Sequence, residues 1–249
     1  MGLFEIFSKE GREKRSREKN VARAVNKYAQ SPDRFKALQS LRDDGSPDAI
    51  FGMLRRFGMM YDKSIEDEQE KEWVFEVLVE KGAAILPQVE RYLNSADSIS
   101  WPLRLLSKIA ERPEELAAVK RVLERHEPGY ERDPTKKIQL LNHLAGLKLP
   151  EAPALCAPYL GDMDEGVRYA AVEALIRHAD EAVARDPLAA HFASDGEESL
   201  RIRLQIAEAF IDLGWQVKTD RPAFDKKLPD QYAIDREGRL KKKTAAPPA

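Results

Sequence analysis

The chain has 249 residues, of which 43% are hydrophobic and 34% are charged, and its formal net charge is −2. This is the composition of an ordinary globular protein that can bury one large core or two smaller ones, and it excludes the disordered and fibrous classes. The negative charge disfavours nucleic acid as the partner, and the single cysteine, Cys156, excludes an internal disulfide.

Residues 1–20 are predicted to be a basic N-terminal segment. Residues 8–27 contain eight Lys or Arg and three Glu, and apolar side chains precede them at Leu3, Phe4, Ile6 and Phe7. We expect these apolar side chains to cap the first helical pair, because a terminal repeat must cover an otherwise open core. Contact with an anionic membrane surface is the alternative. No run of about 18 apolar residues predicts a membrane-spanning helix.

Residues 21–214 carry repeated start and stop signals of helices. A capping oxygen before a proline marks a start, because proline lacks only an N–H that would have no partner there. These starts are Ser31-Pro32, Ser46-Pro47, Asp133-Pro134 and Asp186-Pro187. Glycines that can take a left-handed conformation mark the stops. They are Gly45, Gly82, Gly146, Gly161 and Gly214. With the apolar spacing, these signals predict helices over 33–44, 47–60, 66–82, 84–94, 99–111, 113–126, 134–146, 151–160, 164–178, 181–193 and 197–213.

Several of these helices are apolar on two faces and repeat one pattern. The segment VRYAAVEALI begins at Val167, and IRLQIAEAFI begins 35 residues later at Ile202. A helix with two apolar faces needs cover on both sides, which stacked helical hairpins provide. The pattern therefore predicts an all-α repeat protein, with the repeat domain over residues 21–214.

The residues at 164–175 also carry a family resemblance. Asp164, Val167, Arg168, Ala171, Ala174 and Leu175 follow the pattern D-x-x-V-R-x-x-A-x-x-A-L. This pattern resembles the HEAT-repeat signature, most closely that of the short bacterial type called PBS-lyase-like. The resemblance implies an α-solenoid, a right-handed superhelix of about five to six stacked antiparallel hairpins. It also implies structural roles, within or between repeats, for Asp164, Arg168 and Arg203.

The end of the chain, residues 215–249, loses the helical periodicity. We expect a short irregular extension with a disordered tail, KKKTAAPPA, and a small hairpin in YAIDREGRL that turns at Arg236-Glu237-Gly238. Trp215 and Tyr232 are predicted to pack this extension against the last helical pair.

Motifs that would point to an enzyme are missing from the sequence. It contains no phosphate-binding glycine loop, G-x-S-x-G or H-E-x-x-H. HEAT-like enzymes that bind iron carry repeated His-Glu pairs, and this chain has one such pair, His126-Glu127. Cys156 lies in an apolar segment and is expected to be a buried hydrophobic residue rather than a reactive thiol. We therefore predict no metal, no cofactor and no enzymatic activity.

The resemblance and the missing motifs together predict a scaffold or adaptor. It would be a cytoplasmic monomer that binds another protein on its concave surface. The candidate contact residues are Arg104, Lys108, Glu173, Arg177, Arg201, Glu208 and Asp212. The alternative is a HEAT-like DNA-binding protein or an enzyme similar to alkylpurine DNA glycosylases. In that case Trp73, Trp101 and Trp215 could stack on bases.

Overall fold

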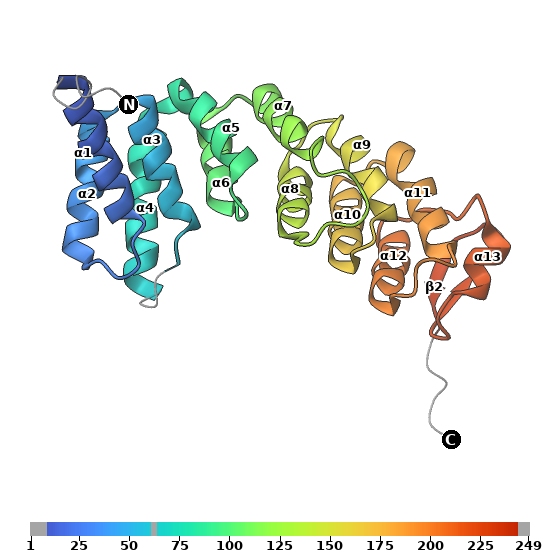
Figure 1. Ribbon diagram of the computed structural model, residues 1–249. Coiled ribbons are helices and arrows are strands. Elements are labelled where there is room, and N and C mark those ends of the chain that lie inside the picture. The colour runs from blue at the N-terminus through green and yellow to red at the C-terminus, as the bar shows by residue number, and fades with distance from the viewer. Residues whose placement is uncertain (1–8, 61–63, 244–249) are drawn as a thin grey trace. The chain divides into compact units, whose positions relative to one another are not determined.

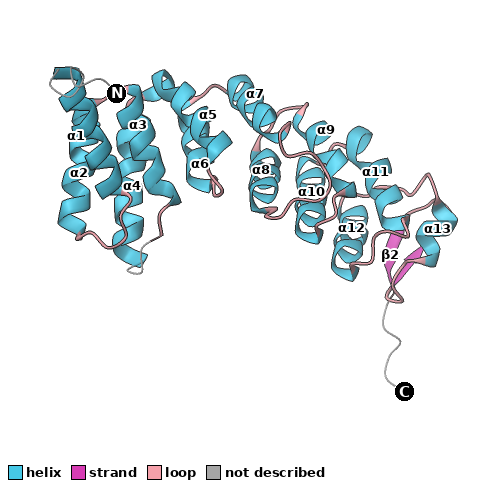
Figure 2. Cartoon of the chain, viewed as in Figure 1, coloured by secondary structure: helices cyan, strands magenta, loops and turns pink. Residues whose placement is uncertain are grey.

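The computed structural model describes residues 9–60 and 64–243. These residues form thirteen α-helices, three short 3-10 helices and two strands, which confirms the predicted all-α class (Figure 2). The α-helices are α1 (Lys9–Ala24), α2 (Ser31–Asp44), α3 (Pro47–Leu54), α4 (Ser64–Glu80), α5 (Leu86–Ser95), α6 (Ser100–Ile109), α7 (Arg112–Leu123), α8 (Thr135–Gly146), α9 (Ala152–Cys156), α10 (Glu165–His178), α11 (Glu181–Ala193), α12 (Leu200–Asp212) and α13 (Arg221–Lys226). The 3-10 helices are η1 (Arg55–Gly58), η2 (Gly82–Ile85) and η3 (Ala157–Gly161), and the strands are β1 (Tyr232–Ile234) and β2 (Leu240–Lys242). None of the helices in this described part has the length and apolar character that crossing a membrane requires.

The chain divides into two compact units, unit 1 (Met1–Ala118) and unit 2 (Val119–Ala249). The division falls inside α7, and each unit is described by itself. The predicted boundaries at residues 20 and 214 stay predictions, although α1 runs across the first of them. The apolar residues at 3–7, for which a cap or a membrane contact was predicted, lie outside the described residues.

Unit 1 consists of two helix layers and a covering helix (Figure 1). Helices α2, α4 and α6 form one layer, α3 and α5 form the other, and α1 packs against α2 and α3. The core between them is apolar. Its fully buried side chains include Leu38, Leu41, Met53, Leu54 and Leu78. Helix α1 approaches α3 at Gly52, where an added Cβ would lie 2.4 Å from Cγ2 of Val21.

A buried ionic network joins three elements of unit 1. Arg34 on α2 and Arg56 on η1 are both 0% exposed. Glu70 on α4 accepts from Arg34 Nη2 at 2.7 Å and from Arg56 Nε at 2.9 Å. Asp67, one turn earlier, accepts from Arg56 Nη2 at 2.7 Å and from Lys71 Nζ at 2.6 Å. Each buried charge in this network thus has a partner of opposite charge. Burying any of these charges without such a partner would cost several kcal/mol of stability.

Unit 2 also has two layers. Helices α8, α10 and α12 lie side by side, and the second layer contains α9 with η3, then α11, then α13 (Figure 1). Asp164 caps α10 by accepting from the N–H of Val167 at 3.0 Å, and Ser199 caps α12 in the same way. These two caps are 35 residues apart, which is the interval of the sequence repeat.

A basic residue recurs in the first turn of each helix of the α8–α10–α12 layer. These residues are Lys137, Arg168 and Arg203, and each donates to a carbonyl oxygen of the loop before its own helix. Lys137 Nζ also donates to Asp162 Oδ2 at 2.9 Å, and Arg168 Nε donates to Glu197 Oε2 at 2.8 Å. Asp162 and Glu197 are buried, and each lies two residues before the cap of the next helix. The base of one repeat therefore bonds to the acid of the next, and unit 2 is built from repeated helix pairs.

The C-terminal extension contains α13, β1 and β2, which corrects the prediction that it is irregular. Phe224 on α13 stacks on Phe192 with ring centroids 3.8 Å apart, and Trp215 meets Phe210 edge-on at 5.7 Å. The predicted hairpin is confirmed, since β1 pairs antiparallel with β2. Lys241 and Lys242 belong to β2 rather than to a disordered tail, because they pair with β1. Residues 244–249 of the predicted tail lie outside the described residues.

Three of the four predicted helix starts are wrong. The cap position of α8 belongs to Pro134 rather than to Asp133. Ser31 does not cap α2, because its Oγ donates to Glu70 Oε1 at 2.9 Å and the cap position belongs to Gln30. Pro187 lies inside α11 rather than at its start. Ser46 does cap α3, since its Oγ accepts from the N–H of Ala49 at 3.3 Å.

The predicted stops are correct at three glycines that close helices. Gly45, Gly82 and Gly214 have φ of 61°, 59° and 68° and follow α2, α4 and α12. Gly146 and Gly161 end their helices without a positive φ, whereas Ala179 takes the left-handed position after α10.

Candidate protein-binding surfaces

The face of α6 carries the two candidate residues of unit 1. Arg104 and Lys108 are both exposed. The guanidinium of Arg104 lies over the ring of Trp101 at 4.3 Å and over that of Phe75 at 5.1 Å. Trp101 in turn stacks on Phe57 at 5.5 Å. Trp101 thus packs against Phe57 and also contacts the guanidinium of Arg104. This contact restricts the position of the Arg104 side chain before a partner binds.

A second stack of the same kind lies in the same helix layer of unit 1. Arg42 at the end of α2 lies over the ring of Trp73 on α4 at 5.8 Å, and Phe35 meets Trp73 at 4.8 Å. Arg42 is exposed, and Phe35 and Trp73 are half-buried. Arg42 is not among the contact residues predicted from the sequence, because its aromatic partner is on another helix. The recurrence of Trp and Arg in these helix segments is the only signal that could have indicated it.

In unit 2 the layer of α8, α10 and α12 carries a third stack. Arg201 on α12 lies over the ring of Tyr169 on α10 at 3.5 Å. Glu173 and Arg177 form an ion pair of 3.1 Å along α10, and both lie on this helix layer. All five candidate residues of unit 2 therefore lie on two neighbouring helices, α10 and α12.

Glu208 is tied to the C-terminal extension. It accepts from the hydroxyl of Tyr232, and Lys242 Nζ lies 2.7 Å from its Oε2. Hydrogen bonds from Lys242 and Tyr232 hold the pKa of Glu208 below its ordinary value. Asp212, one turn later, is exposed. The carboxylate of Glu208 therefore holds β1 and β2 against α12.

The residues predicted to be structural lie in the loops and first turns between repeats. Asp164 is the cap of α10, and Arg168 and Arg203 belong to the recurring basic positions described above. Burial alone would raise the pKa of Glu197, but hydrogen bonds from Arg168 and the Ser199 N–H hold it below its ordinary value. His191 Nε2 lies 2.8 Å from Glu197 Oε2, and burial lowers the pKa of His191.

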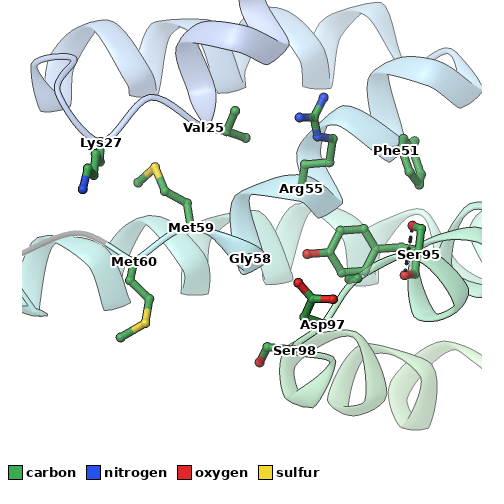
Figure 3. Close-up of a pocket in the computed structure, with 12 residues that line it drawn as sticks. Val25, Lys27, Phe51, Arg55, Gly58, Met59, Met60, Ser95, Asp97 and Ser98 are labelled. Carbon is green, nitrogen blue, oxygen red and sulfur yellow. Dashed lines mark hydrogen bonds between the residues drawn. The ribbon is translucent and has the colours of Figure 1, made fainter. Parts of the chain in front are cut away.

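An open groove in unit 1 was not predicted from the sequence. Its main part, about 620 Å³, lies between the end of α1, η1, α5 and the loop that follows α5 (Figure 3). It adjoins a second hollow of about 580 Å³ between α1, α3 and α5, and the two share Val25, Phe51 and Arg55. We call the two together the α1–α3–α5 groove. Its walls come from elements far apart in the sequence, so no local motif indicates it.

The remaining chemistry-bearing side chains are not grouped. Burial raises the pKa of the Cys156 thiol to about 12, and its Sγ lies 3.4 Å from the carbonyl oxygen of Ala152. His126 Nδ1 lies 2.8 Å from Glu131 Oε1, rather than pairing with the adjacent Glu127. Over residues 9–60 and 64–243, no three His, Cys, Asp or Glu side chains are gathered so that they could hold a metal ion.

No protein-family model matches the chain, and neither does any curated protein. Among solved structures, the chain is similar to that of human deoxyhypusine hydroxylase in complex with glycerol. The identity is 19%, the match covers 84% of this chain and 88% of that one, and the TM-score is 0.31. This finding contradicts the prediction that the chain is not an enzyme, because the similar protein is named as a hydroxylase. We therefore do not propose that the chain lacks catalytic activity, and a similarity of this size assigns it none.

Proposed function

We propose that this protein is a scaffold or adaptor that binds another protein. The binding face is the solvent side of α2, α4 and α6 in unit 1 and of α8, α10 and α12 in unit 2. The HEAT resemblance supports this proposal, because stacked helix pairs offer an extended preformed surface. The right-handed superhelical solenoid, with this face on its concave side, is part of the proposal.

The observation that carries the proposal is the repeated stacking of an exposed arginine on a half-buried aromatic ring. Three such stacks lie on the helices of the proposed face, namely Arg42 on Trp73, Arg104 on Trp101 and Arg201 on Tyr169, and a fourth, Arg91 on Phe51, lies on the other helix layer of unit 1. Arg, Trp and Tyr are the residues most enriched among those that dominate binding energy at protein interfaces. An arginine already held by a ring also loses less side-chain freedom when it binds, which lowers the entropic cost of association.

DNA binding, the alternative, would use the same side chains differently. Arginines and aromatic rings also stack on bases. However, Glu173 and Asp212 lie on the same helix layer as Arg201, and the net charge is −2. Phosphate backbones bind to surfaces with an excess of Lys and Arg, so these carboxylates favour a protein partner.

The test is co-precipitation of the full chain from a native extract, with every co-precipitated protein quantified. We expect Arg104→Ala and Arg201→Ala each to weaken binding of the same partner by about thirtyfold and to reduce its recovery accordingly, because truncating a dominant interface residue costs ~2 kcal/mol. Lys120→Ala and Glu181→Ala change exposed residues outside this helix layer and should leave the recovery unchanged. Recovery that is equal for all four variants, or that nuclease treatment abolishes, would contradict the proposal.

A further inference from the structure

The α1–α3–α5 groove has an apolar floor. Val25, Phe51, Met59 and Tyr92 line it, and Met59 and Tyr92 are buried (Figure 3). Met60 lies at its edge and is 82% exposed. Clefts of several hundred Å³ with apolar linings are typical of binding sites, and methionine adapts to different apolar partners. The floor therefore suits one apolar side chain of an incoming segment.

The rim of the groove is rich in cations. Lys14, Lys27, Arg55 and Arg91 line it, and in the described part of the chain no carboxylate forms an ion pair with the first three. Arg91 lies over the ring of Phe51 at 3.9 Å and 3.5 Å from Asp48. Lys27 Nζ lies 5.1 Å from the centroid of the exposed Tyr28 ring. Cations without a carboxylate partner at the edge of an apolar cleft attract negatively charged groups and increase the rate of association.

Three acidic residues of the lining restrict which anion fits. Glu18 and Asp48 lie in the hollow beside α1, and Asp97 lies across from Arg55 (Figure 3). A nucleic acid carries a charge at every phosphate and would place some of them against these carboxylates. A polypeptide can place its carboxylates beside Lys27 and Arg55 and an uncharged residue beside Asp97. A flat lipid surface cannot enter a concave groove.

From this arrangement we infer that the α1–α3–α5 groove binds an acidic segment of a partner protein that carries an apolar anchor residue. The anchor occupies the floor at Phe51 and Met59, and the flanking carboxylates pair with Lys27 and Arg55. This site lies on α1, α3 and α5, whereas the face proposed above lies on the other helix layer. Either proposal can therefore fail without the other.

The test begins with selection from a random peptide library on the full-length protein. The expected pool has a net negative charge and contains Leu, Ile, Phe or Met. A synthetic peptide from this pool should bind more weakly as salt is raised, because rim charges are screened. It should also bind Arg55→Glu about tenfold more weakly than the parent, since a charge-assisted hydrogen bond is replaced by a repulsion.

The matched control is Lys120→Glu, which makes the same change of charge at an exposed residue that does not line the groove. It should bind the peptide as the parent does, and circular dichroism should show that both variants keep their helical content. The inference is overturned if the pool is neutral or basic, or if Arg55→Glu binds the peptide as tightly as Lys120→Glu. Binding to phosphatidylserine vesicles that survives Arg55→Glu, without any peptide selected, would also overturn it.

Discussion

Ala179 closes α10 in a conformation that suits glycine better than alanine. Its φ is 54°, and its N–H bonds to the carbonyl oxygens of Leu175 and Ile176. A Cβ in the left-handed region is strained by about 1–2 kcal/mol, whereas glycine takes that region freely. The side chain is exposed, so its methyl group contributes little packing to offset the strain.

We therefore predict that Ala179→Gly raises the free energy of unfolding by about 0.5–1 kcal/mol, measured by urea denaturation. The control is Ala190→Gly, an exposed alanine in the interior of α11, which should lower it by about 1 kcal/mol. A loss of stability in Ala179→Gly as large as that in the control would contradict the account of this cap.

Cys156 is the second residue whose behaviour follows from its surroundings. It is 0% exposed, and burial raises the pKa of its thiol to about 12. Because the thiolate is the reactive form, the native protein should not react with a thiol reagent at neutral pH. One thiol should react after unfolding in urea. Rapid modification of the folded protein would show that the segment around α9 opens.

At the scale of elements, one partly buried ion pair joins α10 to the loop that precedes α12. Arg168 Nε donates to Glu197 Oε2 at 2.8 Å, and Glu197 is 0% exposed. Removing one partner from such a pair leaves a buried charge without compensation. Arg168→Ala should therefore lower the free energy of unfolding by about 3 kcal/mol, the lower end of the range for buried pairs.

The matched control on the same helix is Arg177→Ala. Arg177 pairs with Glu173 at 3.1 Å, but both side chains are well exposed. An exposed pair at this spacing contributes ~0.3–0.5 kcal/mol. Urea denaturation of the two variants separates the predictions. Equal losses in Arg168→Ala and Arg177→Ala would show that the recurring base–acid contacts do not stabilise unit 2.

The same contacts predict how stability depends on pH. Burial lowers the pKa of His191, so the unfolded chain binds more protons and stability should fall as the pH drops below about 6.5, the ordinary value for histidine. Burial alone would raise the pKa of Glu70 and of Glu197. Hydrogen bonds from arginines outweigh this effect and hold both pKa values below the ordinary value. Those two contributions are present above about 4.5 and are lost as the pH falls further.

Urea denaturation at a series of pH values should therefore show a first decrease in stability below about pH 6.5 and a second below about 4.5. In His191→Gln the first decrease should be smaller, and the second should remain. A parent protein equally stable at pH 7.5 and pH 5 would contradict the placement of His191.

Most helices could be predicted from the sequence because they depend on local signals. The cap at Ser46 and the stops at Gly45 and Gly214 need no tertiary information. Ser31 shows the limit: its hydroxyl bonds to Glu70, 39 residues away, so it does not cap the helix that begins there. Helix α13 was missed because it is six residues long and is held by Phe224 against other helices.

At the scale of the whole molecule, the candidate surfaces were predictable only in part. The helices that carry Arg104 and Arg201 were recognised from the repeat, but the stacks join residues on different helices. The α1–α3–α5 groove combines Phe51 on α3 and Tyr92 on α5 with Val25 in the turn after α1, and nothing in their spacing indicates that they meet. Each of the two units thus has its own core and its own part of the proposed binding face.

The most direct test of protein binding through the α2–α4–α6 layer of unit 1 and the α8–α10–α12 layer of unit 2 is site-specific photo-crosslinking in a native extract. A photoreactive phenylalanine analogue would replace Lys108 on α6 or Arg177 on α10, and exposed Pro87 on α5 or Ala190 on α11 as controls. The account predicts discrete adducts at the first two positions that protease removes and nuclease does not. Adducts that form equally at all four positions, or that nuclease removes, would contradict it.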